Sequence, residues 1–248
     1  MEDSDEFKEF VKMMGEVSDD DAESESGVIV DYDLGALGDA LASHGGSGSG
    51  EAREVIRILH DAGIPSCVVG AHALRYYGAG RIGVAWEVGV PTEKLDEAIH
   101  LFKAEPQSKA YEPWPSHHIP QPWSLVHTFP HFHLKGVHFT FYLIPSWDYL
   151  MDCKESNFEK SSMGIPYPKL EILAQSLLDT QRWADLEDLI DGMNLSEEWG
   201  NEHLQLDRTY DIAYAEEKNK RIRASVKKTF LSSLLELNST QRVEVIRD

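Results

Sequence analysis

The chain has little cysteine and no long apolar run. Only Cys67 and Cys153 occur among its 248 residues, so the sequence offers no disulfide framework of the kind that stabilises small secreted domains. No stretch approaches the roughly 18 apolar residues that cross a bilayer, and no segment has the apolar core of a secretory signal. We therefore expect a cytoplasmic protein without a membrane partner.

Basic residues are also scarce. The chain has 23 Lys and Arg against 43 Asp and Glu, which gives a formal net charge of −20. A strongly negative field repels nucleic acid phosphates, so the composition argues against DNA as a partner and admits a tRNA only through a local basic patch. Part of the acidity lies at the front, where residues 1–26 carry eleven Asp and Glu against two Lys.

Composition divides the chain into three segments. Residues 1–50 are acidic and serine-rich and end in the stretch Gly45–Gly50. We expect them to be largely disordered, with the glycine-rich stretch as a linker. Residues 51–165 predict a small α/β domain, and residues 166–248 predict a helical C-terminal region.

The hydrophobic pattern predicts the order of the elements. Apolar residues at helical spacing follow Glu51, and the first predicted strand is Ser66–Val69. Further helices are expected at 71–77, 93–102, 170–181, 183–193, 197–206 and 209–238, further strands at 84–90, 125–132 and 136–144, and a loop at 104–124. Strands mixed with helices and then helices alone predict an α+β fold, with a small mixed sheet and flanking helices.

One segment carries the most specific pattern. The strand Val68-Val69 enters a turn at Gly70-Ala71, and the turn opens a helix that ends at Gly78. The chain then passes through Arg81 into the strand Val84-Ala85-Trp86-Glu87-Val88. A glycine turn before a helix lets a phosphate approach backbone N–H groups at the helix N-terminus.

This pattern resembles the nucleotidyltransferase superfamily, the fold of DNA polymerase beta. The resemblance covers roughly residues 52–200, and the segment Gln181 to Leu189 is similar to the helical part of these proteins. The closest overall likeness is to uncharacterised proteins of filamentous fungi. The resemblance implies a nucleotide substrate and two Mg²⁺ ions, held by two carboxylates two residues apart on one strand and a third from a neighbouring strand.

The chain departs from this pattern at the carboxylates. The first position falls on Ala85 and the second on Glu87, while the strand at 137–144 offers His138 and Thr140 but no acid. One carboxylate cannot hold two Mg²⁺ ions, so ordinary nucleotidyl transfer is in doubt. Glu87 is the candidate catalytic residue, as a general base or a ligand of a single Mg²⁺, and His138 is the candidate second metal ligand.

Five further residues are candidates for substrate binding. Gly70 would shape the turn, Arg75 and Arg81 would bind anionic groups, and His72 lies on the same helix face as Arg75. Trp86 would contribute a planar wall. In the alternative without a binding role, the aromatic residues pack in the hydrophobic core.

Two other patterns have a metal-binding reading. His131-x-His133 would share one face of a strand, where His127 or His138 could complete a Zn²⁺ site. Asp19-Asp20-Asp21-Ala22-Glu23 matches a string that binds Mg²⁺–diphosphate in some enzymes. The sequence favours the alternative interpretation, in which exposed and half-buried imidazoles and a solvated acidic run account for the same residues.

Three functions remain open from the sequence. The first is a biosynthetic transferase with altered active-site chemistry on a nucleotidyltransferase-like fold, in fungal secondary metabolism. The second is a tRNA-dependent, arginine-containing cyclodipeptide synthase that takes aminoacyl-tRNA, with Glu87 binding a substrate guanidinium. The third is an inactive pseudoenzyme that binds a nucleotide or a protein.

Overall fold

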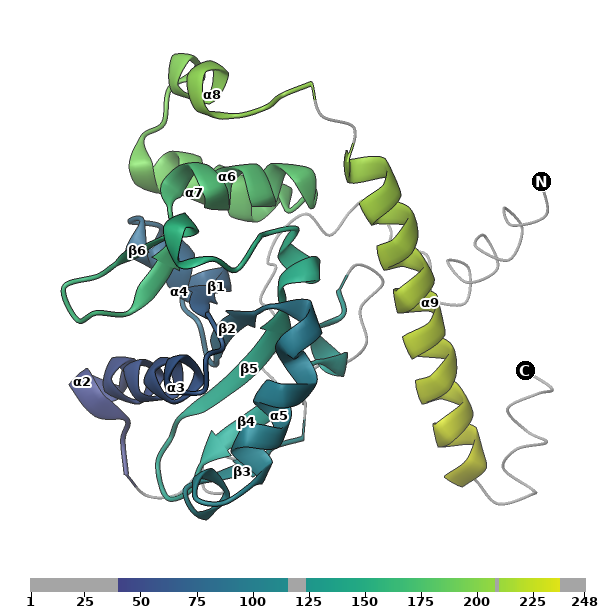
Figure 1. Cartoon of the computed structure of the whole chain (residues 1–248). Helices are drawn as coiled ribbons and strands as arrows, with labels where there is room; N and C mark the ends of the chain where they lie inside the picture. The colour runs from purple at the N-terminus through teal and green to yellow at the C-terminus, as the bar shows by residue number, and fades with distance from the viewer. Residues whose placement is uncertain (1–39, 116–123, 208–209, 237–248) are drawn as a thin grey trace, which may run out of the picture. The chain divides into compact units, whose positions relative to one another are not determined.

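The computed structural model describes residues 40–115, 124–207 and 210–236 (Figure 1). All of them belong to the unit formed by residues 34–248. The predictions made for residues 1–39, including the acidic string at Asp19, lie outside the described residues.

A mixed five-stranded sheet forms the centre of this unit. Its strands are β1 (Cys67–Val69), β2 (Trp86–Val90), β3 (Tyr111–Pro113), β4 (His131–Leu134) and β5 (Thr140–Pro145), in the order β1-β2-β5-β4-β3. β2 and β5 run parallel, and the other three neighbouring pairs are antiparallel. A second, two-stranded sheet pairs β6 (Phe158–Lys160) with β7 (Pro166–Pro168).

One face of the central sheet carries the main hydrophobic core. Alternate residues of a strand point to the same face, so Val88 of β2 and Leu143 of β5, which pair in register, both reach it. Helices α3 (Ser49–Asp61) and α5 (Leu95–Lys103) bury their apolar stripes in the same core, with Val55, Leu59 and Phe102 fully covered.

The opposite face carries a smaller cluster and the acid of interest. Cys67 and Val69 of β1 pack there with Tyr142 and Ile144 of β5. Because Glu87 pairs in register with Val69 and with Tyr142, its side chain belongs to this face.

The remaining helices are α2 (Ser43–Gly46), α4 (Gly70–Tyr76), α6 (Leu170–Asp179), α7 (Trp183–Met193), α8 (Glu197–His203) and α9 (Tyr210–Glu236). In Figure 1, α6 and α7 lie together above the sheet and α9 runs as a long helix beside it. No helix in the described ranges combines the length and the apolarity needed to cross a membrane.

The predicted α+β class is confirmed, and the predicted bounds of α7 match the structure. The division at residues 50 and 165 stays a prediction. Two local predictions are wrong. Residues 125–130 hold a short 3-10 turn in place of a strand, and the loop expected at 104–124 contains β3.

The expected linker Gly45–Gly50 is also not a linker, since it forms the end of α2 and the start of α3. Ser43 explains the order there. Its hydroxyl accepts a hydrogen bond from the Gly50 N–H at 2.8 Å, and its own N–H donates to Glu51 Oε1 at 3.0 Å. These bonds satisfy polar groups at the start of α3, which glycine and serine content alone does not predict.

Candidate functional site

The glycine turn and Glu87 lie against each other. Gly70 has a φ of +62°, and a Cβ added to it would lie 2.0 Å from Glu87 Oε1. Only glycine allows both this backbone conformation and this approach. The turn after β1 is therefore the place where the Glu87 carboxylate is seated.

Two donors hold the Glu87 carboxylate. The Tyr149 hydroxyl donates to Oε2 at 3.0 Å, and the backbone N–H of Ala71, in the first turn of α4, donates to the same carboxylate. Burial nevertheless raises the pKa of Glu87, with a further rise from Asp185, against the lowering by Arg182 and by these hydrogen bonds. A carboxyl group of raised pKa is suited to proton transfer.

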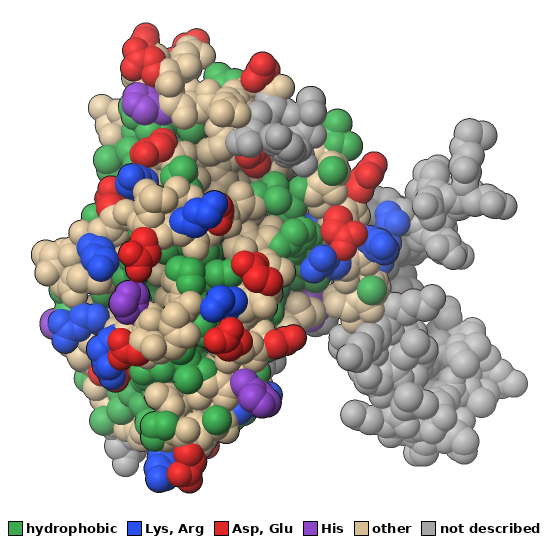
Figure 2. All heavy atoms as spheres, viewed as in Figure 1, with side chains coloured by type: hydrophobic (Ala, Val, Ile, Leu, Met, Phe, Trp, Pro, Cys, Tyr) green, Lys and Arg blue, Asp and Glu red, His purple; other side chains and the backbone are tan. Residues whose placement is uncertain are grey.

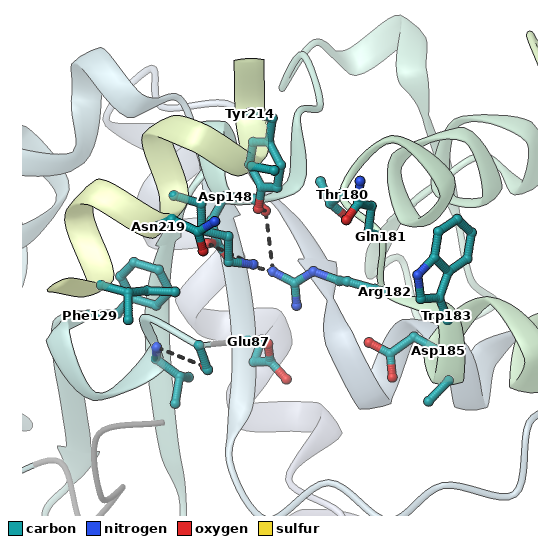
Figure 3. Close-up of a pocket in the computed structure, with 16 residues that line it drawn as sticks. Glu87, Phe129, Asp148, Thr180, Gln181, Arg182, Trp183, Asp185, Tyr214 and Asn219 are labelled. Atoms are coloured by element: carbon teal, nitrogen blue, oxygen red, sulfur yellow. Dashed lines mark hydrogen bonds and ion pairs between the residues drawn. The ribbon is translucent and has the colours of Figure 1, made fainter. Parts of the chain in front are cut away.

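Glu87 lines a cavity of about 500 Å³ that β2, α7, α9 and the segment after β5 enclose (Figure 3). In Figure 3 the Glu87 and Asp185 carboxylates both lie below the Arg182 side chain, with Glu87 nearer the guanidinium. The other polar side chains lining it include Asp148, Thr180, Gln181, Lys218 and Asn219. The cavity thus combines three carboxylates with two cations.

Arg182 is the centre of a buried network in this cavity. Its guanidinium forms an ion pair with Asp148, whose side chain is 5% exposed, and lies 4.0 Å from the centre of the Tyr149 ring. Lys218 Nζ lies 4.0 Å from Asp148 Oδ1, and the Tyr214 hydroxyl donates to the Asp148 carbonyl at 2.7 Å. Asp148 therefore joins the start of α7, through Arg182, to α9, through Lys218 and Tyr214.

Sequence reasoning missed this network. Arg182, Asp148, Tyr149 and Lys218 come from separate elements, and only Arg182 falls in a segment that the family resemblance covers with a specific likeness. No spacing rule connects an arginine before one helix with an aspartate 34 residues earlier. Arg182 precedes α7 directly after Gln181, which has a φ of +57°, so this left-handed residue turns the chain at the cavity.

Arg81 pairs with α7. Its Nη1 lies 3.0 Å from Asp185 Oδ1, and its Nε donates to Asp188. The side chain is 40% exposed, so the pairs are partly solvated. Arg81 is predicted to bind an anionic substrate, but in the structure the carboxylates of Asp185 and Asp188 already pair with its guanidinium.

The other predicted site residues line a second cavity. His72, Arg75, Trp86 and His138 border a space of about 310 Å³, and none of its lining residues is shared with the cavity of Glu87. Trp86 and Glu87 are neighbours on β2, so their side chains point to opposite faces of the sheet. The structure therefore does not bring His138 to Glu87, and the expected metal pair is not assembled.

The residues present do not fit a two-Mg²⁺ centre. On the parallel strand β5, the residue that pairs with Glu87 is Tyr142, and the residue two positions before Glu87 is Ala85. His131 stacks on Tyr142 with ring centres 3.9 Å apart, and His133 Nδ1 lies 3.3 Å from Glu112 Oε1. Within residues 40–115, 124–207 and 210–236, no three His, Cys, Asp or Glu side chains form a metal-binding group.

His72 gives the first testable prediction. Burial, and then the charge of Arg75, lowers its pKa to about 4. The unfolded chain binds this proton near pH 6.5, so stability is present above that pH and is lost as the pH falls toward 4. Between pH 8 and pH 5 the loss from this group should be about 2 kcal/mol.

The variant His72→Gln should remove that loss. Urea denaturation at pH 8 and pH 5 measures it, with His60→Gln, a replacement of an exposed histidine, as the control. Equal acid sensitivity of the wild-type protein and His72→Gln would contradict the assignment.

No protein-family model and no curated protein sequence matches the chain. Among solved structures, the antibiotic-resistance factor ANT(2'')-Ia is 11% identical with a TM-score of 0.33, over 74% of this chain and 95% of the other. The Megavirus polyadenylate synthase is 16% identical with a TM-score of 0.32, over 59% of this chain and 32% of the other. At TM-scores this low, neither likeness bears on the activity of this chain.

Proposed function

We propose that this chain is a transferase-type enzyme on a nucleotidyltransferase-like fold, with Glu87 as a general base in place of a two-metal centre. One observation supports it above the others. A single carboxyl group of raised pKa lines a cavity of about 500 Å³ that can hold a small substrate. An ionised carboxylate can accept the proton of an amine or hydroxyl nucleophile, and a raised pKa makes it a stronger base.

The local topology supports the fold in this proposal. β1, the turn at Gly70, α4 and β2 follow one another as the family resemblance implies, and β5 lies parallel to β2 beside the acid. The positions that would carry the carboxylates hold Ala85, Glu87 and Tyr142. No step of the proposed chemistry passes through Mg²⁺, because these three positions supply one carboxylate, and the other two acids of the cavity, Asp148 and Asp185, pair with Arg182 and Arg81.

The roles of the cavity residues follow from their contacts. Tyr149 fixes the Glu87 carboxylate through its hydroxyl, and Arg182 lowers the cost of the ionised form. Asp148 holds Arg182 in place through its Oδ2 atom. A nucleotide or another small polar molecule would enter between Glu87 and the residues of α9, and secondary metabolism remains the proposed setting.

A second candidate is a pseudoenzyme that binds a nucleotide or a protein without turnover. The observation in its favour is the contact between Glu87 and the N-terminus of α4. The carboxylate accepts the Ala71 N–H, where the family resemblance would seat a substrate phosphate. A side chain that satisfies a helix end can be structural alone.

The cyclodipeptide synthase alternative gains no support. A substrate guanidinium at Glu87 would meet the chain's own Arg182 guanidinium, which already lies beside that carboxylate (Figure 3). On the face shown in Figure 2, basic and acidic side chains are interspersed among the described residues, without a continuous basic patch for a tRNA. Aminoacyl-tRNA stays a prediction from the sequence.

The test compares the wild-type protein with Glu87→Gln. Each protein is incubated with ATP, CTP, GTP or UTP and a small-molecule yeast extract, with and without MgCl₂, and substrate depletion is followed by mass spectrometry. We expect turnover with the wild-type protein that Glu87→Gln lowers at least about 100-fold, the range of general acid–base catalysis. The turnover should persist without MgCl₂.

The exposed Glu93→Gln is the matched control and should match the wild-type rate. Equal turnover by Glu87→Gln would contradict the role of Glu87. Absence of turnover, together with stabilisation of the wild-type protein by a nucleotide in a thermal shift, would replace the transferase with the pseudoenzyme.

A further inference from the structure

A second cavity, of about 310 Å³, lies apart from the one that Glu87 lines. The loop at His44 to Gly48, the helix α4, the segment before β2 and the residues around His138 enclose it. None of its described lining residues is Asp or Glu, whereas Arg75 and the three imidazoles of His44, His72 and His138 face it. In a chain with a formal charge of −20, this lining is unusual.

Two buried imidazole nitrogens here lack a partner. His72 is 9% exposed and stacks on Trp86 with ring centres 4.0 Å apart at an interplanar angle of 16°, yet its Nδ1 has no hydrogen bond within the described part of the chain. The Nε2 atom of His138 is also buried and has no hydrogen-bond partner within the described part of the chain. Buried polar atoms normally have a partner, so two at one cavity indicate a ligand.

Arg75 adds a fixed charge to these nitrogens. It is an exposed residue of α4, one turn after His72, and no described residue pairs with its guanidinium. Glu51, in the first turn of α3, accepts a hydrogen bond from the Ser43 N–H at 3.0 Å and does not line the cavity. A planar guanidinium binds carboxylate and phosphate through two parallel hydrogen bonds.

A glycine-rich loop, residues 44–48, borders the cavity. His44, Gly45, Gly46 and Gly48 all have positive φ, and a Cβ at Gly45 or Gly46 would meet no atom within 4 Å. The N–H groups of Gly46 and Gly48 bond inside the loop, to Ala42 and Ser43. The loop therefore shapes the cavity, and the donors come from Arg75 and the imidazoles.

We propose that this second cavity binds the acidic group of a small molecule, a phosphate or a carboxylate, through Arg75, His72 and His138. Apolar side chains flank the donors. Trp86 and Phe139 line the inner wall, and Ile82 and Val84 are 89% and 66% exposed at the rim. The ligand therefore joins an acidic group to an apolar body, and its site is independent of the transferase chemistry at Glu87.

The test uses phenyl phosphate and benzoate as probes, titrated at constant ionic strength into the full chain and followed by calorimetry and by NMR of the histidine rings. We expect at least one probe to bind, to shift the His72 and His138 ring signals, and to raise the pKa of His72. Tighter binding of phenyl phosphate assigns a phosphate group, and tighter binding of benzoate assigns a carboxylate. Arg75→Gln should weaken binding at least about 10-fold, in keeping with a lost charged hydrogen bond.

Two controls keep the outcome specific. Arg57→Gln, which replaces an exposed side chain of α3, should bind as the wild-type protein does, and the exposed Glu93→Gln should also bind normally because Glu93 lines neither cavity. Failure of both probes to bind, or equal binding by Arg75→Gln, overturns the proposal. Either result leaves the Glu87 assay unaffected.

Discussion

Replacing Gly70 by alanine should destabilise the protein by about 3 kcal/mol. The left-handed backbone costs a residue with a Cβ roughly 1–2 kcal/mol, and forcing a methyl into an occupied space costs a further 1–3 kcal/mol or so. Here the occupied space is the Glu87 carboxylate, 2.0 Å from the added Cβ. Chemical denaturation of the variant measures the free energy of unfolding.

The double variant Gly70→Ala with Glu87→Ala separates these two costs. Shortening Glu87 clears the space but leaves the backbone strain, so the two changes should couple by at least about 1 kcal/mol. Gly80→Ala is the control, because its Cβ would meet nothing within 4 Å and its φ is not positive. Additive effects of the two changes would mean that the turn does not seat the carboxylate.

The positions of Gly70 and Glu87 show what the sequence could predict. The strand, the glycine turn and the returning strand are consecutive, and the register of β1 with β2 places residue 87 opposite residue 69. Local pattern sufficed for this. It also sufficed for α7, because its apolar spacing begins and ends clearly at Trp183 and Met193.

The same strand shows why the rest of the site was missed. Trp86 and Glu87 were assigned to one site although successive residues of a strand face opposite sides. His138 was assigned to a strand that begins only at Thr140, so it lies before the sheet, where its N–H bonds to the Ala40 carbonyl at 2.9 Å. An error of four residues in a strand boundary was enough to move a candidate ligand to another cavity.

The Arg182 network could not be predicted at all. An ion pair between residues 34 positions apart depends on how α6 and the residues after it lie against the turn that follows β5, which no local periodicity encodes. The net charge of −20 does not predict it either, because a net charge does not say where single cations lie, and two of them line one cavity. Tertiary packing decides which of the many charged residues are buried.

Replacing Arg182 by alanine should cost about 4 kcal/mol of unfolding free energy, because removing one partner of a buried pair leaves the other charge uncompensated. Asp148 is 4% exposed with Arg182 in place, and the cation that would remain beside it is Lys218, whose Nζ lies 4.0 Å from Oδ1. The loss of the guanidinium should also raise the pKa of Glu87 further, since Arg182 lowers it. Denaturation measures the first effect, and NMR titration of the Glu87 carboxyl measures the second.

Two comparisons make this prediction specific to burial. Arg57→Ala removes an exposed arginine that pairs with Glu54 and Asp61, and it should cost less than about 1 kcal/mol. Combining Arg182→Met with Asp148→Leu removes both partners of the ion pair and should be less destabilising than Arg182→Ala alone, because Asp148 is no longer left behind without Arg182, even though Lys218 loses its contact with Asp148. If the double variant is instead the least stable, the pair contributes more than mutual neutralisation, and the cavity depends on both charges for its shape.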